Sequence, residues 1–174
     1  MQTERVLSSA SVPWVPGRHT MENVRSTRMP PAEQITAGFV LVRDADERLL
    51  LTHVNLPGRG WDAPGGHLDA GEDVLTAAVR EVAEETGFAL STTDLSLIGW
   101  QRFTLLDEAP VDYEYPAPVS YAVWFSARTG LAAPPLAPDE RSECGPAGWF
   151  TRDEAMRRCA TADWLPFYRD ITGS

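Results

Sequence analysis

The chain of 174 residues contains no lysine, so its fifteen cationic side chains are all arginines. The absence of lysine excludes a P-loop lysine and a lysine Schiff base as catalytic groups. With 25 acidic residues the formal net charge is −10, which argues against binding to duplex nucleic acid. An acidic protein can still bind phosphate groups where a divalent cation lies between the two negative charges.

Cysteine and long apolar segments are also scarce. Cys144 and Cys159 are the only cysteines and do not form a CxxC pair, so we expect reduced structural thiols rather than a zinc site. No stretch approaches the ~20 apolar residues of a membrane-spanning helix. The first twenty residues lack the apolar segment of a signal peptide. We therefore expect a cytoplasmic protein that does not contact membranes.

The composition changes near residue 35. Residues 1–34 are polar and contain prolines, and we interpret them as an N-terminal extension in which residues 18–26 are compatible with a short helix. Residues 35–174 have the length and apolar content of one domain. The sequence permits a homodimer in which the extension forms a contact.

The predicted domain alternates between strands and loops before its last helices. Residues 35–54 are apolar and β-branched around a polar turn, and they predict a β hairpin. Residues 94–106 and 119–128 are expected to form two further strands. Long loops are expected at residues 107–119 and 131–148, and such loops in compact domains are often functional.

The strongest helix signal follows the first hairpin. Asp69 and Glu72 are spaced as a capping box and predict a helix that begins near Glu72 and ends at Gly87. Its expected apolar face consists of Leu75, Ala78, Val79 and Val82. A capping box at Thr151 predicts a second helix, and we expect a terminal helix interrupted by Pro166.

Three glutamates lie on one side of the first helix. Glu81, Glu84 and Glu85 have i, i+3, i+4 spacing, so their carboxylates can converge, and such oxygen ligands suit Mg²⁺ or Mn²⁺. A solvated acidic face is the alternative, because like-charge pairs at this spacing cost only about 0.2–0.5 kcal/mol each. The preceding Gly66 can offer its carbonyl to a cation, and Arg80 can pair with Glu84.

The pattern of residues 66–88 resembles a complete Nudix box. Its fixed positions are Gly66, Glu72, Arg80, Glu81, Val82, Glu84, Glu85, Gly87 and Phe88. With the flanking segments the resemblance covers about residues 35–155. It implies a Nudix hydrolase with an α/β fold, an α/β/α sandwich around a mixed sheet. Such enzymes cleave the diphosphate linkage between a nucleoside diphosphate and another group, X.

The resemblance also implies a metal site and a mechanism. The implied ligands of Mg²⁺ or Mn²⁺ are the Gly66 carbonyl and the carboxylates of Glu81, Glu84 and Glu85. The cation would neutralise diphosphate oxygens and lower the pKa of a bound water. Glu84 or Glu85 would position or deprotonate that water for attack on phosphorus.

Two supporting roles follow from the same resemblance. Arg80 is expected to orient the carboxylates, while Glu72 either caps the helix or supports the site through Arg80. Many members of the family use one more acidic residue from a loop outside the box. Glu140 is our candidate for that residue, with Glu143 as the alternative.

Aromatic residues outside the box are candidates for substrate binding. They are Trp61, His67, Tyr113, Tyr115 and Tyr121. Rings on loops can stack on a nucleobase, and they can equally fix a loop to the domain. The markers of particular Nudix substrates are not matched, so the sequence leaves the identity of X open.

Two other functions remain as alternatives. A non-catalytic module that senses nucleotides is one, although such modules commonly lose glutamates of the box. An isomerase of isopentenyl diphosphate with the same fold is the other, but it usually departs from the box pattern that residues 66–88 retain.

Overall fold

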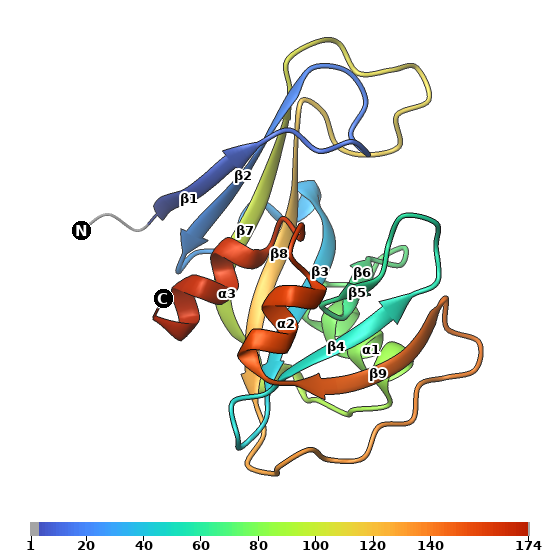
Figure 1. Cartoon of the computed structure of the whole chain (residues 1–174). Helices are drawn as coiled ribbons and strands as arrows, with labels where there is room; N and C mark the ends of the chain where they lie inside the picture. The colour runs from blue at the N-terminus through green and yellow to red at the C-terminus, as the bar shows by residue number, and fades with distance from the viewer. Residues whose placement is uncertain (1–3, 174) are drawn as a thin grey trace.

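The computed structural model describes residues 4–173, and these form a mixed sheet of nine strands with three α helices (Figure 1). The strands are β1 (Glu4–Ala10), β2 (His19–Ser26), β3 (Ile35–Arg43), β4 (Leu49–Val54), β5 (Trp61–Asp62), β6 (Gly65–His67), β7 (Ser96–Leu105), β8 (Val119–Arg128) and β9 (Cys144–Phe150). The helices are α1 (Val74–Thr86), α2 (Arg152–Arg158) and α3 (Leu165–Thr172).

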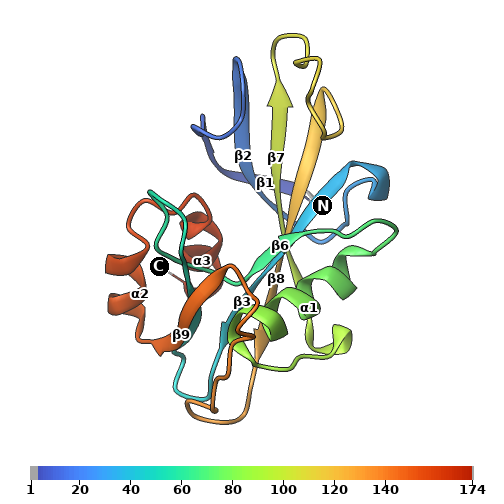
Figure 2. The same cartoon turned by 90° about the vertical axis from the view of Figure 1, so that its right-hand side faces the viewer.

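The sheet runs in the order β1-β2-β7-β8-β3-β4-β5, with β6 paired to β3 and β9 paired to β4. The pair of β3 and β8 is parallel, and the other paired strands are antiparallel. Helix α1 covers one face, and α2 and α3 cover the other (Figure 2). The expected α/β/α sandwich around a mixed sheet is therefore confirmed.

Alternation along the central strands separates two apolar cores. In β3, Val40 and Val42 pack toward α1, whereas Leu41 packs toward α2 and α3. Successive side chains of a strand point to opposite faces, so one buried strand supplies both layers. Val82 of α1 packs in the core with Val40 and Val42, and Trp164 beside α3 packs in the core with Leu41.

The N-terminal segment differs from the expectation. Residues 18–26 contain strand β2 and no helix, so the expected short helix is wrong. Pairing of β2 with β7 along its length buries Met21, Asn23 and Val24, and these long-range contacts outweigh local helix propensity. The predicted extension thus supplies β1 and β2 to the same sheet as the rest of the chain.

The first helix begins later than its sequence suggests. Asp73 caps α1 through hydrogen bonds from the backbone amides of Leu75 and Thr76, so the expected cap at Asp69 is wrong and the helix begins two residues after Glu72. Asp69 and Asp73 are four residues apart, and an aspartate at either position suits the cap of a helix. Gly87 ends the helix in the left-handed conformation, as expected, with φ of 70°.

The buried face of α1 is also rotated from the expected one. It consists of Val74, Ala77, Ala78, Val82 and Thr86, whereas Leu75 and Val79 are only half-buried. A Cβ atom at Gly38 of β3 would lie 2.9 Å from a methyl group of Val74. The glycine therefore lets the helix approach the sheet along this face.

The C-terminal helices follow their expected signals in part. Thr151 and Glu154 form the predicted capping box of α2. Pro166 lies in the first turn of α3, where a missing amide costs little, so the expected interruption is wrong. Among the described residues, no helix has the length and apolar content needed to cross a membrane.

Candidate active site

Arg80 organises the acidic side of α1. Its Nη1 donates to Glu81 Oε1 at 2.9 Å and to Glu84 Oε2 at 3.3 Å. Its Nε and Nη2 donate to the two carboxylate oxygens of Glu72, both at 2.9 Å. Nη2 also contacts the carbonyl of His67 at 3.2 Å. One guanidinium thus joins the helix to the segment that leads into it, and its geometry suits such bidentate pairing.

Glu72 does not cap α1, because it lies before the helix and Asp73 is the cap; it instead holds Arg80. Its Oε2 accepts a hydrogen bond from the backbone amide of Asp69 at 2.9 Å while the carboxylate also holds Arg80. The guanidinium of Arg80 lowers the pKa of Glu72, mainly through this hydrogen bond. Glu72 is therefore ionised and fastens the loop to the helix.

Gly66 brings the backbone of β6 against the acidic cluster. A Cβ atom at this position would lie 2.7 Å from Oε1 of Glu81, which is closer than ordinary contact. Gly66 pairs with Gly38 of β3, so its strand is fixed between the sheet and α1. The backbone at Gly66 and the carboxylate of Glu81 are consequently neighbours because the residue has no side chain.

Glu85 points to a different set of partners. Its Oε2 accepts from the amide of Gly65 at 3.0 Å, and its Oε1 accepts from Sγ of Cys144 at 3.0 Å. Burial raises the pKa of Glu85 to about 7, and these two hydrogen bonds offset part of the rise. Burial also raises the pKa of Glu81, against the opposing effect of Arg80.

The three glutamates therefore do not converge on one point in this arrangement. Glu81 and Glu84 share one nitrogen of Arg80, whereas Glu85 is held by β6 and β9. Within residues 4–173, no three Asp, Glu, His or Cys side chains are grouped so that they could hold a metal ion. The metal-ligand set implied by the sequence stays a prediction.

The loop between β8 and β9 is fastened to the end of α1. The amide of Asp139 donates to the Glu84 carbonyl at 2.8 Å, and the amide of Ala137 donates to the Thr86 carbonyl at 3.1 Å. Glu140 follows this anchor directly and is exposed, as is Glu143. The loop thus brings Glu140 near the C-terminal part of the helix, and its catalytic role stays a prediction.

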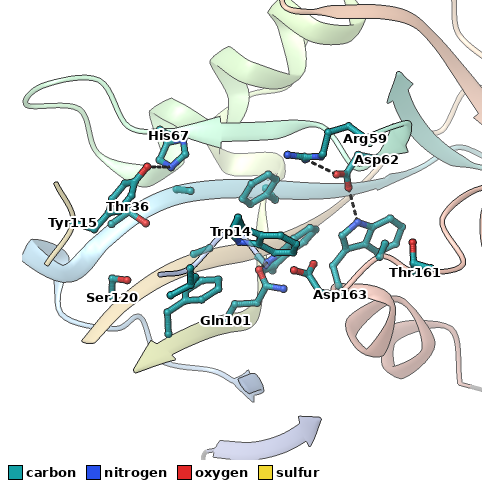
Figure 3. Close-up of a pocket in the computed structure, with 18 of the residues that line it drawn as sticks. Trp14, Thr36, Arg59, Asp62, His67, Gln101, Tyr115, Ser120, Thr161 and Asp163 are labelled. Carbon is teal, nitrogen blue, oxygen red and sulfur yellow. Dashed lines mark hydrogen bonds and ion pairs between the residues drawn. The ribbon is translucent and has the colours of Figure 1, made fainter. Parts of the chain in front are cut away.

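A pocket of about 680 Å³ lies on the side of β6 away from α1, within the range of small-molecule sites (Figure 3). Four of the predicted substrate-binding residues line it: Trp61, His67, Tyr113 and Tyr115. Tyr121 does not line it. Its ring instead packs edge-on against Trp100 at 5.2 Å in the core under α1.

His67 connects the pocket to the acidic cluster. It follows Gly66 in β6, and its Nε2 lies 3.2 Å from the hydroxyl of Tyr115, with the two rings stacked at 5.5 Å. Trp61 is already packed against Phe150, and the guanidinium of Arg158 lies 5.2 Å from the centre of its ring. His67 and Tyr115 therefore form one wall of the pocket.

Several pocket residues were not identified from the sequence. They include Trp14, Arg59, Asp62, Gln101, Asp163 and Trp164. Two signals were available. Trp14 is a lone aromatic residue between prolines in a polar segment, and Gln101 is an amide in the middle of an apolar strand.

A family model for the NUDIX domain matches residues 32–171. Among curated proteins, the chain is 32% identical over 134 residues to the NAD-capped RNA hydrolase NudC of Mycobacterium tuberculosis, covering 74% of this chain and 36% of that protein. It is 39% identical over 67 residues to the m7GpppN-mRNA hydrolase NUDT17 of Xenopus laevis, covering 36% of this chain and 23% of that protein. The aligned part is thus little more than a third of these relatives' length, or less.

Solved structures share the fold at low sequence identity. The pyrophosphohydrolase BsRppH of Bacillus subtilis has a TM-score of 0.61 at 20% identity and covers 89% of this chain and 91% of its own. A C. elegans Ap4A hydrolase has a TM-score of 0.57 at 19% identity and covers 79% and 94%. With the family model matching most of its length, this chain belongs to the NUDIX domain family.

Proposed function

We propose that the protein hydrolyses a diphosphate linkage in a nucleoside diphosphate-X compound and depends on Mg²⁺ or Mn²⁺. One observation carries this proposal: the Glu81 carboxylate, held by Arg80, lies beside the backbone of Gly66, and the next residue, His67, lines the pocket. A substrate in the pocket can thus place its phosphates against the acidic side of α1.

The donor chemistry at this place suits a hard divalent cation, toward which the three carboxylates would have to turn together. Glu81, Glu84 and Glu85 supply carboxylate oxygens, and the carbonyl of Gly66 is the fourth proposed ligand. Burial raises the pKa of both Glu81 and Glu85, and a nearby cation favours the ionised form of such groups. When bound, the cation would neutralise diphosphate oxygens and lower the pKa of a water molecule.

The side chains of the chain itself then have separate roles. Glu84 is the more exposed of the Arg80-linked pair, with 48% of its side chain accessible against 17% for Glu81. We assign the positioning or deprotonation of the attacking water to Glu84 or Glu85, with Glu140 as a further acidic group from the loop. Arg80 orients Glu81 and Glu84, and the pocket residues position the substrate.

The names of the similar proteins support hydrolysis. They include an NAD-capped RNA hydrolase, an m7GpppN-mRNA hydrolase and a pyrophosphohydrolase. The same names do not select one substrate for this chain, so X stays open. A nucleotide-sensing module and a diphosphate isomerase are the alternatives that an assay must separate from hydrolysis.

The test is phosphate release from a panel of nucleoside diphosphate-X compounds with Mg²⁺, using phosphatase coupling. We expect turnover of at least one compound, and a loss of about 10²-fold or more in Glu84→Gln or Glu85→Gln with the fold intact. Glu108→Gln, in an exposed loop outside the pocket, is the matched control and should behave as wild type. Tight binding without turnover of any compound would favour the sensor instead.

A further inference from the structure

The pocket contains a large aromatic side chain that the rest of the protein leaves exposed. Trp14 lies in the loop between β1 and β2 and keeps 61% of its surface accessible. Among the described residues, no aromatic ring or guanidinium stacks on it, whereas Trp61, Trp124 and Trp164 all pack against other rings. An exposed indole at the rim of a pocket is suited to stacking on a flat ligand.

The loop that carries Trp14 is fixed at both ends. The amide of Val12 donates to Nε2 of His19 at 2.9 Å, and Val12 itself is buried. At the other end, Nη2 of Arg18 donates to Asp107 at 2.6 Å, and the Arg18 carbonyl accepts from the amide of Leu106 at 2.8 Å. The position of Trp14 is therefore defined although its side chain is free.

A second, independent feature lies deeper in the same pocket. Gln101 is only 3% exposed, and its Oε1 accepts from Nε1 of Trp124 at 3.0 Å. This contact fixes the amide orientation and directs Nε2 away. Nε2 forms no hydrogen bond of normal geometry among residues 4–173, and it faces the carboxylate of Asp163 (Figure 3). An amide nitrogen carries two N–H donors, so one can face Asp163 while the other remains for an acceptor on a ligand.

The carboxylate of Asp163 lies beside this amide, and Figure 3 shows the two groups pointing toward one another. Burial raises the pKa of Asp163, and Gln101 offsets part of that rise. The carbonyl of Asp163 accepts from Nδ2 of Asn23 at 2.7 Å, which ties the segment to β2. The pocket thus offers a hydrogen-bond donor next to an acceptor.

We propose that this pocket binds the nucleobase of the substrate, with Trp14 stacked on its face and Gln101 and Asp163 bonded to its edge. The base must then present an acceptor next to an N–H group, as nucleobases do on their pairing edges. The proposal rests on the proposed function, since it assigns the nucleoside part of that substrate. Trp14 lies outside residues 32–171, so the base would be bound partly by a segment outside the family match.

Binding of uncleavable analogues tests the proposal without turnover. The ligands are the α,β-methylene analogues of ADP, GDP, CDP and UDP, with methylenediphosphonate as the base-free reference, measured by calorimetry on the full chain with Mg²⁺. We expect at least one nucleotide analogue to bind more tightly than methylenediphosphonate. Trp14→Ala should weaken that binding by about 5- to 150-fold, the range for one stacked base.

Matched variants separate base recognition from structural damage. Trp14→Phe should restore most of the affinity, and Leu131→Ala, at an exposed apolar residue outside the pocket, should leave it unchanged. Gln101→Met and Asp163→Asn should each reduce the difference in affinity between the best and worst base. The affinity for methylenediphosphonate should be the same in wild type and Trp14→Ala.

The proposal is overturned if no nucleotide analogue binds more tightly than methylenediphosphonate, or if Trp14→Ala weakens both to the same extent. It is also overturned if Trp14→Ala changes nucleotide affinity by less than about twofold. These outcomes are independent of hydrolysis. Phosphate release that is insensitive to Trp14→Ala would refute base stacking and leave the proposed function standing. Base binding through Trp14 without turnover of any compound would support base stacking and refute the proposed hydrolysis.

Discussion

Replacement of Gly66 by alanine perturbs the acidic cluster by a single methyl group. The added Cβ would lie 2.7 Å from Oε1 of Glu81, so the carboxylate must move by about 0.7 Å to reach the 3.4 Å of ordinary contact. Glu81 also holds Nη1 of Arg80, which in turn contacts Glu84. A displacement near 1 Å at reacting groups can reduce turnover by about 10²-fold.

We therefore expect Gly66→Ala to lower kcat by about 10- to 100-fold and to raise the Mg²⁺ concentration needed for half-maximal rate. Phosphate release measured against Mg²⁺ concentration gives both values, and thermal unfolding reports on the fold. Gly130→Ala is the matched control, because a Cβ at Gly130 meets nothing within 4 Å and its φ is not in the left-handed region. A Gly66→Ala enzyme with normal rate and normal Mg²⁺ dependence would refute this reasoning.

Three further predictions concern stability and positioning. Asp44 is fully buried, which raises its pKa, but hydrogen bonds from Ala133, Arg48 and Asp46 outweigh burial and lower it. The ionised carboxylate therefore stabilises the fold, and this contribution to the free energy of unfolding should be lost as pH falls below about 4. Asp44→Asn should cost about 1.5–3 kcal/mol in urea unfolding at pH 7 and flatten that acid dependence. Gly87→Ala should lower the free energy of unfolding by at least about 1 kcal/mol, since φ is 70° there and the Cβ would collide with the backbone of Ala137. Arg80→Lys should lower kcat while leaving the melting temperature within a few degrees, because lysine cannot form the bidentate pair with Glu72.

The sequence predicts well what nearby residues decide. The pairing of Arg80 with Glu84, the end of α1 at Gly87 and the capping box at Thr151 all depend on residues within one turn, and the structure contains each of them. The local pattern of residues 18–26 is compatible with a short helix, but the segment forms strand β2 because it pairs with β7 about 80 residues away.

For the candidate site, too, the sequence predicts what neighbouring residues decide and misses what distant segments decide. The acidic side of α1 follows from spacing, but the direction of Glu85 does not, since its partners Gly65 and Cys144 come from two other strands. The pocket is assembled from segments far apart in the sequence, among them those of Trp14 and Asp163. Local pattern contains little information about such a pocket, and only the sheet topology brings those segments together.

Titration of Mn²⁺ into the protein, followed by the loss of the free-ion electron paramagnetic resonance signal, tests the central claim most directly. The account predicts saturable binding that is at least about tenfold weaker in Glu81→Gln and Glu85→Gln and unchanged in Glu108→Gln. Equal binding in all four proteins, or no saturable binding in the wild type, would contradict the assignment of a cation to the acidic side of α1.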